Sequence, residues 1–236
     1  MTDARYRSLT NIPGIGETLA ARLIRRNIYT RAELRNIIDE LPRATQAHIR
    51  HRVSRRIDRT TARALVAELR RRLVVSAPHQ LVAVGSVRRG ARASKDVDIL
   101  VVVPGARYIY GTLASATLRP PRPRDRVEIV DTYAGGARRR SIIVGYTAAR
   151  RRTCYYVVDL FLATEDERPF AMFHYTGSAR YNIRVRAHAK RLGYVLNQYG
   201  IYNAATGAAV AKNIRTEREL LRFLGVTYKP PAQRCE

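Results

Sequence analysis

The first third of the chain carries apolar residues at the three- and four-residue spacing of a single helix face. Four segments show this pattern: 17–26, 30–41, 44–53 and 60–73. Such spacing predicts amphipathic helices. Thr30 and Thr60 are expected N-caps, because a threonine hydroxyl can accept a backbone N–H of the first helical turn. Residues 1–75 are therefore predicted to form a helical region.

Beyond residue 75 the pattern changes from helical to extended. Five short runs are rich in β-branched and aromatic residues: 81–87, 96–103, 126–133, 140–146 and 154–163. Gly, Pro and Arg separate these runs, which is typical of strands joined by turns. The segment 107–117 favours a helix between two of the strands. We therefore expect a mixed β-sheet within residues 76–165.

The last part of the chain, residues 166–236, combines both patterns. The segments 178–193 and 216–225 have helical spacing and end in glycine, as many helices do. Thr216 is the expected N-cap of the second. No repeat or low-complexity linker separates the three regions, so we expect subdomains of one working unit. The fold class predicted is α+β, with a helical first part, a mixed sheet and a small α/β C-terminal subdomain.

Composition places the chain among globular proteins. Of its 236 residues, 46% are hydrophobic and 27% are charged, which is enough apolar content for a folded core. No apolar run is long enough to span a membrane, and the first residues do not have the pattern of a signal peptide. Cys154 and Cys235 match neither a disulfide framework nor a zinc site. We expect a soluble, monomeric protein in a reducing intracellular compartment.

The net charge of +25 indicates the class of partner. Arg supplies all but four of the 44 basic residues. An excess of this size is self-repulsive unless a polyanion neutralises it, so nucleic acid is the expected partner.

The segment 9–24, LTNIPGIGETLAARLI, has the shape of a helix-hairpin-helix. Gly14 and Gly16 would let the backbone of the tight turn approach a phosphate closely. The helix that follows would direct its first N–H groups at the same phosphate. Such a hairpin grips the DNA backbone and reads no bases. The alternative is an ordinary turn between two helices.

Asp96 and Asp98 begin a strand one residue apart, so their side chains point to the same face. Two adjacent carboxylates repel and both ionise comfortably only with a cation between them, and oxygen ligands of this kind suit Mg²⁺. Asp159, within another aliphatic run, is the expected third carboxylate. Three carboxylates would hold two metal ions for in-line phosphoryl transfer. The Gly85–Ser86 turn, with Arg89, would bind phosphates. The alternative is a surface Asp pair at the start of a strand.

Four motifs in this order resemble those of family X DNA polymerases. They are PGIG (13–16), GSVRRGARASKDVDILV (85–101), YTGSARYNIRVRAHAKRLGY (175–194) and LGVTYKPPAQR (224–234). The resemblance implies a nucleotidyltransferase palm beside helix-hairpin-helix fingers. It also implies a repair polymerase that fills gaps by adding deoxynucleotides to a primer 3′-hydroxyl under template direction, without proofreading.

The resemblance implies a role for particular residues. Asp96 and Asp98 would bind both Mg²⁺ ions, for which Mn²⁺ is a substitute, and Asp159 the catalytic one. The carbonyls of Thr10, Ile12 and Ile15 would hold Na⁺ or K⁺ at the hairpin.

The same comparison predicts how the nucleotide and the template are bound. The deoxynucleoside triphosphate would contact a set of residues from all three regions: Arg56, Ser86, Arg89, Ser94, Lys95, His174, Tyr175, Gly177, Ala179 and Asn182. Arg186 would reach the template strand of gapped or primer-template DNA.

The chain departs from the family pattern at several of these positions. Lys95 replaces a glycine, Ala179 replaces an aspartate that packs on the incoming base, and Val157 replaces an arginine near the third carboxylate. The pair His174–Tyr175 replaces the usual Tyr-Phe pair beside the sugar. No lyase domain precedes the hairpin, so lyase activity is not expected.

Two other functions are compatible with parts of the sequence. A template-independent terminal transferase would carry a long loop, whereas the segment 131–146 is short. A non-catalytic DNA-end-binding protein would not need three carboxylates. His188 is more typical of a packed or solvated helix face than of catalysis. The arginine runs at 138–140 and 150–152 would either grip template backbone or form a solvated hairpin.

Overall fold

The computed structural model describes residues 2–119, 126–147, 152–210 and 213–234. The first elements are helical: α1 (Thr2–Thr10), α2 (Glu17–Arg25), α3 (Arg31–Asn36), the 3-10 turn η1 (Ile38–Glu40) and α4 (Arg43–Arg50). The helices predicted over 17–26 and 44–53 are confirmed, and the one over 30–41 is divided into α3 and η1. Helix α1 escapes prediction because its mostly polar sequence offers few apolar positions, of which Leu9 is fully buried.

Of the two N-caps predicted in the N-terminal region, one is correct. The Thr30 hydroxyl accepts the Glu33 N–H at 3.2 Å, and the Glu33 carboxylate accepts the Thr30 N–H at 2.9 Å, which completes a capping box. Thr60 is wrong as the cap of α5 (Arg59–Arg72). The Asp58 carboxylate accepts the N–H of Thr61 at 3.0 Å and its hydroxyl at 2.6 Å instead. A charged acceptor makes the stronger bond, so the helix starts at Arg59.

A five-stranded mixed sheet forms the centre of the molecule, in the order β3-β5-β9-β8-β7. Its strands are β3 (Gln80–Ala83), β5 (Val97–Val103), β9 (Cys154–Thr164), β8 (Arg139–Tyr146) and β7 (Val127–Gly135). Strands β5 and β9 are parallel, and the other neighbours are antiparallel. The five predicted runs are confirmed as strands, except that the second half of 81–87 enters the short helix α6 (Gly85–Arg88).

Helix α5 covers one face of this sheet. Its buried residues Leu65 and Leu69 share a core with Val97 and Ile99 of β5. The division predicted at residue 75 groups α5 with the N-terminal helices, whereas its apolar face packs on the sheet. The other face of the sheet carries Leu100, which packs with Val84 before α6 and with Ala163 of β9.

The helix predicted over 107–117 is wrong. The segment instead forms the 3-10 turn η2 (Ala106–Tyr108), further turns and the short strand β6 (Thr117–Leu118), which pairs with β2 (Leu73–Val74). Gly111 has a φ of 81°, outside the right-handed helical region, so a continuous helix cannot pass through it. A second pair of short strands, β1 (Ile57–Asp58) and β4 (Ala93–Ser94), joins the start of α5 to the approach of β5.

The C-terminal part has a core of its own. Its elements are α7 (Arg168–Thr176), α8 (Ala179–Arg191), β10 (Tyr194–Leu196), β11 (Ile201–Asn203), α9 (Glu217–Phe223) and the 3-10 turn η3 (Pro231–Gln233). The helices predicted over 178–193 and 216–225 are confirmed as α8 and α9, and Thr216 caps α9 in a capping box. Helix α7 has no wide polar face, since Phe170, Ala171 and Phe173 are all buried, and periodicity does not reveal it.

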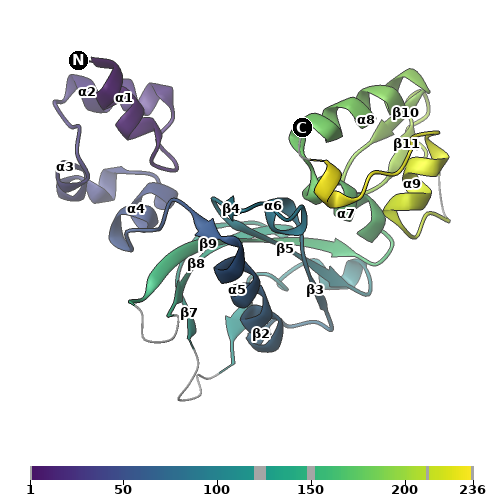
Figure 1. The fold of residues 1–236 in the computed structure, drawn as a ribbon, viewed down its shortest axis with the longest axis horizontal. Helices are drawn as coiled ribbons and strands as arrows, with labels where there is room; N and C mark the ends of the chain where they lie inside the picture. Colours follow the sequence, from purple (N-terminus) through teal and green to yellow (C-terminus); the bar gives the residue numbers. More distant parts are fainter. Residues whose placement is uncertain (1, 120–125, 148–151, 211–212, 235–236) are drawn as a thin grey trace.

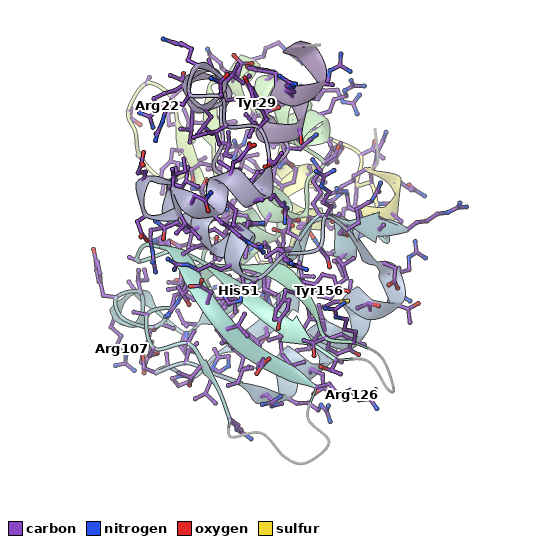
Figure 2. The ribbon with its side chains drawn as sticks, turned by 90° about the vertical axis from the view of Figure 1, so that its left-hand side faces the viewer. Arg22, Tyr29, His51, Arg107, Arg126 and Tyr156 are labelled. Carbon is purple, nitrogen blue, oxygen red and sulfur yellow. The ribbon has the colours of Figure 1, made fainter. Side chains whose placement is uncertain are left out.

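Helices α1–α4 and the C-terminal part stand on the same side of the sheet, at its two ends (Figure 1). Helix α4 reaches β7 through a small apolar cluster that includes Ala47 and Ile143. In the side view, basic side chains extend from Arg22 on the N-terminal helices to Arg126 beyond the sheet (Figure 2). Within the described residues, every helix is too short or too polar to cross a membrane.

Candidate active site

The parallel pairing of β5 with β9 brings the predicted carboxylates together. Asp98 and Asp159 are direct register partners, and Asp96 precedes β5 by one residue. Alternation along β5 places Asp98 on the face of Leu100 and away from the face covered by α5. The three side chains therefore gather on the face of the sheet opposite α5, where Asp96 and Asp98 line a cavity of about 880 Å³.

The turn at Gly85 packs closely against Asp98 because Gly85 has no side chain. A Cβ atom at Gly85 would lie 1.8 Å from Oδ2 of Asp98, and Gly85 has a φ of 58°. Val84 donates its N–H to the Asp98 carbonyl at 2.9 Å, which fixes the backbone beside it. Only glycine satisfies both the close approach and the left-handed conformation. The carboxylate and the predicted phosphate-binding turn are thereby held against each other.

The electrostatics of the site favour the arrival of a cation. Burial, followed by repulsion from Asp96 and Asp159, raises the pKa of Asp98 to about 7. Burial and the Asp159 charge also raise the pKa of Asp96. Carboxylate oxygens with this mutual repulsion are suitable ligands for a divalent ion, so the chemistry of the Asp96 and Asp98 pair suits Mg²⁺.

Asp159 is oriented differently from the other two carboxylates. It is 7% exposed and is not among the described residues that line the cavity. Its Oδ1 accepts the Ser141 hydroxyl, and its Oδ2 accepts Nη2 of Arg139 at 3.0 Å. In the part of the chain that is described, no three His, Cys, Asp or Glu side chains stand in an arrangement that could hold a metal ion.

The cavity gathers every residue that was predicted to bind the nucleotide. Besides the two carboxylates, these lining residues are Arg56, Ser86, Arg89, Ser94, Lys95, His174, Tyr175, Gly177, Ala179 and Asn182. Arg186, predicted at the template strand, lines the same cavity. Sequence reasoning missed four lining residues: Arg55, Ala93, Phe161 and Ile183. Phe161 lies two residues after Asp159, and this spacing on a strand was a usable signal, because it puts both side chains on one face.

The predicted phosphate-binding turn is linked to the C-terminal part. The Ser86 hydroxyl donates to the Ser94 hydroxyl at 2.8 Å, and the Arg89 guanidinium donates to the Thr176 carbonyl. Arg88 donates to the Glu217 carboxylate at 2.5 Å. Both arginines of the Arg88–Arg89 pair therefore hold α6 against the elements that follow the sheet.

The pair His174–Tyr175 is fixed by neighbours on α8 and β9. Asn182 donates its side-chain N–H to the His174 carbonyl at 2.7 Å, and Nη2 of Arg186 lies 2.5 Å from Nδ1 of His174. Burial and the Arg186 charge lower the pKa of His174 to about 4, so the ring is neutral and Nδ1 accepts this bond. The Tyr175 ring stacks on Phe161 with centroids 4.1 Å apart.

The hairpin lies apart from this cavity. Gly14 has a φ of 84°, and a Cβ atom there would lie 2.5 Å from Oγ1 of Thr45, whose hydroxyl donates to the Pro13 carbonyl at 3.0 Å. Gly14 is therefore required by packing against α4. Gly16, at the N-cap of α2, has open space where a side chain would go and leaves the first turn without a side-chain cap.

The predicted cation ligands belong to the same turn. Ile12 and Ile15 bury their side chains, and the Ile12 carbonyl accepts the Ile15 N–H at 3.0 Å. Thr10 ends α1, and its hydroxyl donates to the Tyr6 carbonyl at 3.0 Å. One of the three predicted carbonyl ligands is thus already used within the turn, although a carbonyl has a second lone pair.

The arginine run at 138–140 is built into the fold. Arg138 binds Glu167 at 2.7 Å, Arg139 binds Asp159 and Arg140 donates to the carbonyls of Leu113 and Ala114. All three side chains have partners within the fold, although the Arg139 side chain is largely exposed. Of the second run, residues 150 and 151 lie outside the described residues. His188 lies 2.9 Å from the Leu224 carbonyl through Nε2, in agreement with a packed histidine.

Known proteins resemble both the C-terminal part and the chain as a whole. A family model described as DNA polymerase beta thumb matches residues 171–235. The Repair DNA polymerase X of African swine fever virus is 35% identical over 183 residues, which are 74% of this chain and 97% of the viral protein.

Two cellular proteins align at lower identity. DNA polymerase lambda of Rattus norvegicus is 27% identical over 97% of this chain and 38% of its own length. The DNA polymerase/3′-5′ exonuclease PolX of Bacillus subtilis is 29% identical over 62% of this chain and 23% of its own length. The alignment with the viral protein covers about three quarters of this chain and nearly all of the viral protein. The thumb match falls on the C-terminal part, which lines the carboxylate cavity. This chain therefore belongs to the family X DNA polymerases.

Proposed function

We propose that this protein is a template-directed DNA polymerase that fills short gaps during DNA repair. The observation that carries the proposal is the parallel register of Asp98 with Asp159 beside Asp96, at a cavity that also gathers the predicted phosphate ligands. In the reaction, the primer 3′-oxygen forms a bond to the α-phosphorus of a deoxynucleoside triphosphate as the bond to pyrophosphate breaks.

Asp96, Asp98 and Asp159 would hold two divalent ions, Mg²⁺ or in its place Mn²⁺. Such ions supply Lewis-acid stabilisation of the charge that develops on the transferring phosphate. Ser86 and Arg89, together with Arg56 and Lys95, would bind the triphosphate from the same cavity. Gly177 permits this arrangement, since a Cβ atom there would lie 3.1 Å from Nη1 of Arg89.

The sugar and the base would meet the elements of the C-terminal part. The Tyr175 ring, stacked on Phe161, offers a flat apolar support to the deoxyribose. The His174 carbonyl, which Asn182 engages at 2.7 Å, would crowd a ribose 2′-hydroxyl. Asn182 would then exchange this bond for the minor-groove edge of the incoming base, next to Ala179.

The hairpin and the net charge of +25 would bind the DNA backbone. Gly16 leaves the first turn of α2 open to a phosphate. Carbonyls of Thr10, Ile12 and Ile15 would bind Na⁺ or K⁺ next to that phosphate.

The connection between β7 and β8 supports template direction. Strand β7 ends at Gly135 and β8 begins at Arg139, and Gly136 donates its N–H to the Arg139 carbonyl at 2.8 Å across this turn. A turn of this length cannot occupy the position of a template strand, as a terminal transferase would require.

The test is single-nucleotide insertion on one-nucleotide-gapped DNA, with each of the four deoxynucleotides, compared with a single-stranded primer. We expect insertion of the complementary nucleotide on gapped DNA and little extension of the single strand. Untemplated addition of similar rate would identify a terminal transferase. Tight DNA binding without any insertion, in either Mg²⁺ or Mn²⁺, would identify a non-catalytic DNA-end-binding protein.

A further inference from the structure

Strand β8 supplies a donor to each oxygen of the Asp159 carboxylate. Ser141 lies directly opposite Asp159 in the antiparallel register, and Arg139 lies opposite Phe161, one pair further along the same face. The Ser141 hydroxyl donates to Oδ1, and Arg139 donates to Oδ2 at 3.0 Å. The pairing of the two strands therefore determines which side chains reach the third carboxylate.

The two donors differ in burial and in freedom to move. Ser141 is 1% exposed, and the Tyr133 hydroxyl lies beside it, so its position is fixed by packing. The Arg139 side chain is 61% exposed and extends from the first residue of β8. Its guanidinium also lies 5.6 Å from the centroid of the Phe161 ring, at the wall of the cavity. A long exposed side chain can leave the carboxylate without disturbing the sheet.

The two donors also differ in charge. Ser141 is neutral and orients the carboxylate without changing the charge of the site. Arg139 brings a positive charge close to both Asp96 and Asp98, where it opposes the repulsion among the carboxylates. A divalent ion bound through Oδ2 of Asp159 would take the place that the guanidinium now occupies. The ion and Arg139 therefore compete for one oxygen, whereas Ser141 occupies the other.

From these contacts we infer that Ser141 and Arg139 are positioning residues with opposite effects on metal binding. Ser141 orients Asp159 for the ion, and Arg139 is the internal counter-cation that the ion displaces. This inference rests on the proposed function, since it takes Asp159 to be a metal ligand.

The direct measurement is Mn²⁺ binding to the full chain without DNA or nucleotide, followed by the electron paramagnetic resonance of the free ion. Arg139→Gln is expected to bind Mn²⁺ about three- to tenfold more tightly, because one ion pair no longer competes. Ser141→Ala is expected to bind it more weakly by a similar factor, because Oδ1 loses its fixed donor. The matched control is Arg107→Gln, which removes the same charge at an exposed position in η2, beyond the opposite end of β5 from Asp98 and its register partner Asp159.

Conservative variants separate positioning from folding. Arg139→Lys keeps the charge and should bind Mn²⁺ as the wild type does. Ser141→Cys keeps the size of the buried side chain with a weaker donor, and should fall between Ser141→Ala and the wild type. Thermal melting of each variant without metal reports whether the sheet is intact.

The result that overturns the inference is a change of the same sign, or no change, in Arg139→Gln and Ser141→Ala while the wild type inserts nucleotides and binds Mn²⁺. Failure of the proposed function has a different signature: the wild type itself inserts no nucleotide on gapped DNA. Affinity changes in opposite directions, with Arg107→Gln unchanged, support the inference.

Discussion

Burial and two neighbouring carboxylates both disfavour the charged form of the Asp98 side chain. Its side chain touches the turn at Gly85 on one side and is repelled by two carboxylates on the others. A carboxyl group in such a place binds its proton more tightly in the folded protein than in the unfolded chain. The site is therefore built for a charge that the chain alone does not supply.

This conflict predicts how the stability of the metal-free protein depends on pH. The pKa of Asp98 rises from 3.8 to about 7 on folding, so the folded state holds an additional proton between these values. The free energy of unfolding should consequently fall as the pH rises through this window and stay low above it. Asp98→Asn removes the cost and should stabilise the metal-free protein at pH 8 by about 1–3 kcal/mol, with a smaller gain near pH 5.

Urea unfolding in the presence of a chelator, at pH 5 and pH 8, measures both effects. Added Mg²⁺ should stabilise the wild type at pH 8 more than it stabilises Asp98→Asn. If Asp98→Asn is less stable than the wild type at pH 8, the charge of Asp98 does not destabilise the metal-free protein.

Asp159→Ala separates chemistry from DNA binding. In the proposed function the carboxylate serves the catalytic metal, whereas affinity for DNA comes from the basic surface and the hairpin. Insertion by this variant should therefore fall by at least about a thousandfold. The dissociation constant for gapped DNA should change by less than about threefold. Single-turnover insertion and DNA binding are measured on one protein preparation, and retained insertion would contradict the assignment.

The sequence predicts the three carboxylates but not what surrounds the third. Asp96 and Asp98 follow from their spacing at the head of a strand, and Asp159 from a charge inside an aliphatic run. Arg139 and Ser141 could not be assigned, because their contact with Asp159 depends on the register of β8 against β9. Val157, where the family pattern has an arginine, is buried against Ala47 and Ile143. The positive charge beside Asp159 comes instead from Arg139 on the neighbouring strand β8.

At the scale of elements, prediction succeeds where one face is apolar and the other polar. Helices α2, α4, α5, α8 and α9 have this property. Strands β5, β8 and β9 are buried over most of both faces, and their runs of β-branched and aromatic residues predicted them instead. Helix α7 lacks this property because it is buried on most sides. The segment 107–117 has apolar residues at helical spacing, but the backbone conformation of Gly111 prevents a helix there. The strand order could not be predicted, since pairing between distant segments leaves no periodic signal.

The hairpin gives a prediction in which two neighbouring glycines behave differently. A side chain at Gly16 meets only open space, so Gly16→Ala should leave the melting temperature nearly unchanged. Its methyl group would stand between the first turn of α2 and a phosphate, and affinity for gapped DNA should fall about three- to tenfold.

Gly14→Ala is the matched comparison. It places a Cβ atom 2.5 Å from Oγ1 of Thr45 at a φ of 84°, so it should destabilise the protein by about 1–3 kcal/mol. Melting temperature and DNA affinity are measured for both variants. If Gly16→Ala binds gapped DNA as the wild type does, the hairpin is only a structural turn.

At the scale of the whole molecule, ion pairs join the parts that surround the carboxylates. Glu217 of α9 binds Arg88 of α6 at 2.5 Å and Arg234 at 2.8 Å, which ties the C-terminal part to the predicted phosphate-binding turn. His51, just after α4, lies 3.2 Å from Asp131 of β7. These contacts and the apolar cluster under α4 hold the N-terminal helices and the C-terminal part at the two ends of the sheet (Figure 1).

The distribution of charge over this arrangement predicts how DNA binding responds to salt. With a net charge of +25 and basic side chains along its whole length (Figure 2), the protein should neutralise several phosphates at once. The logarithm of affinity should then fall linearly with the logarithm of salt, and six contacts would weaken binding about a thousandfold between 50 and 200 mM. Fluorescence anisotropy with labelled gapped DNA measures this slope. Arg107→Gln, remote from the hairpin, is the control and should leave the slope unchanged. A slope near zero for the wild type would mean that the excess positive charge does not serve phosphate binding.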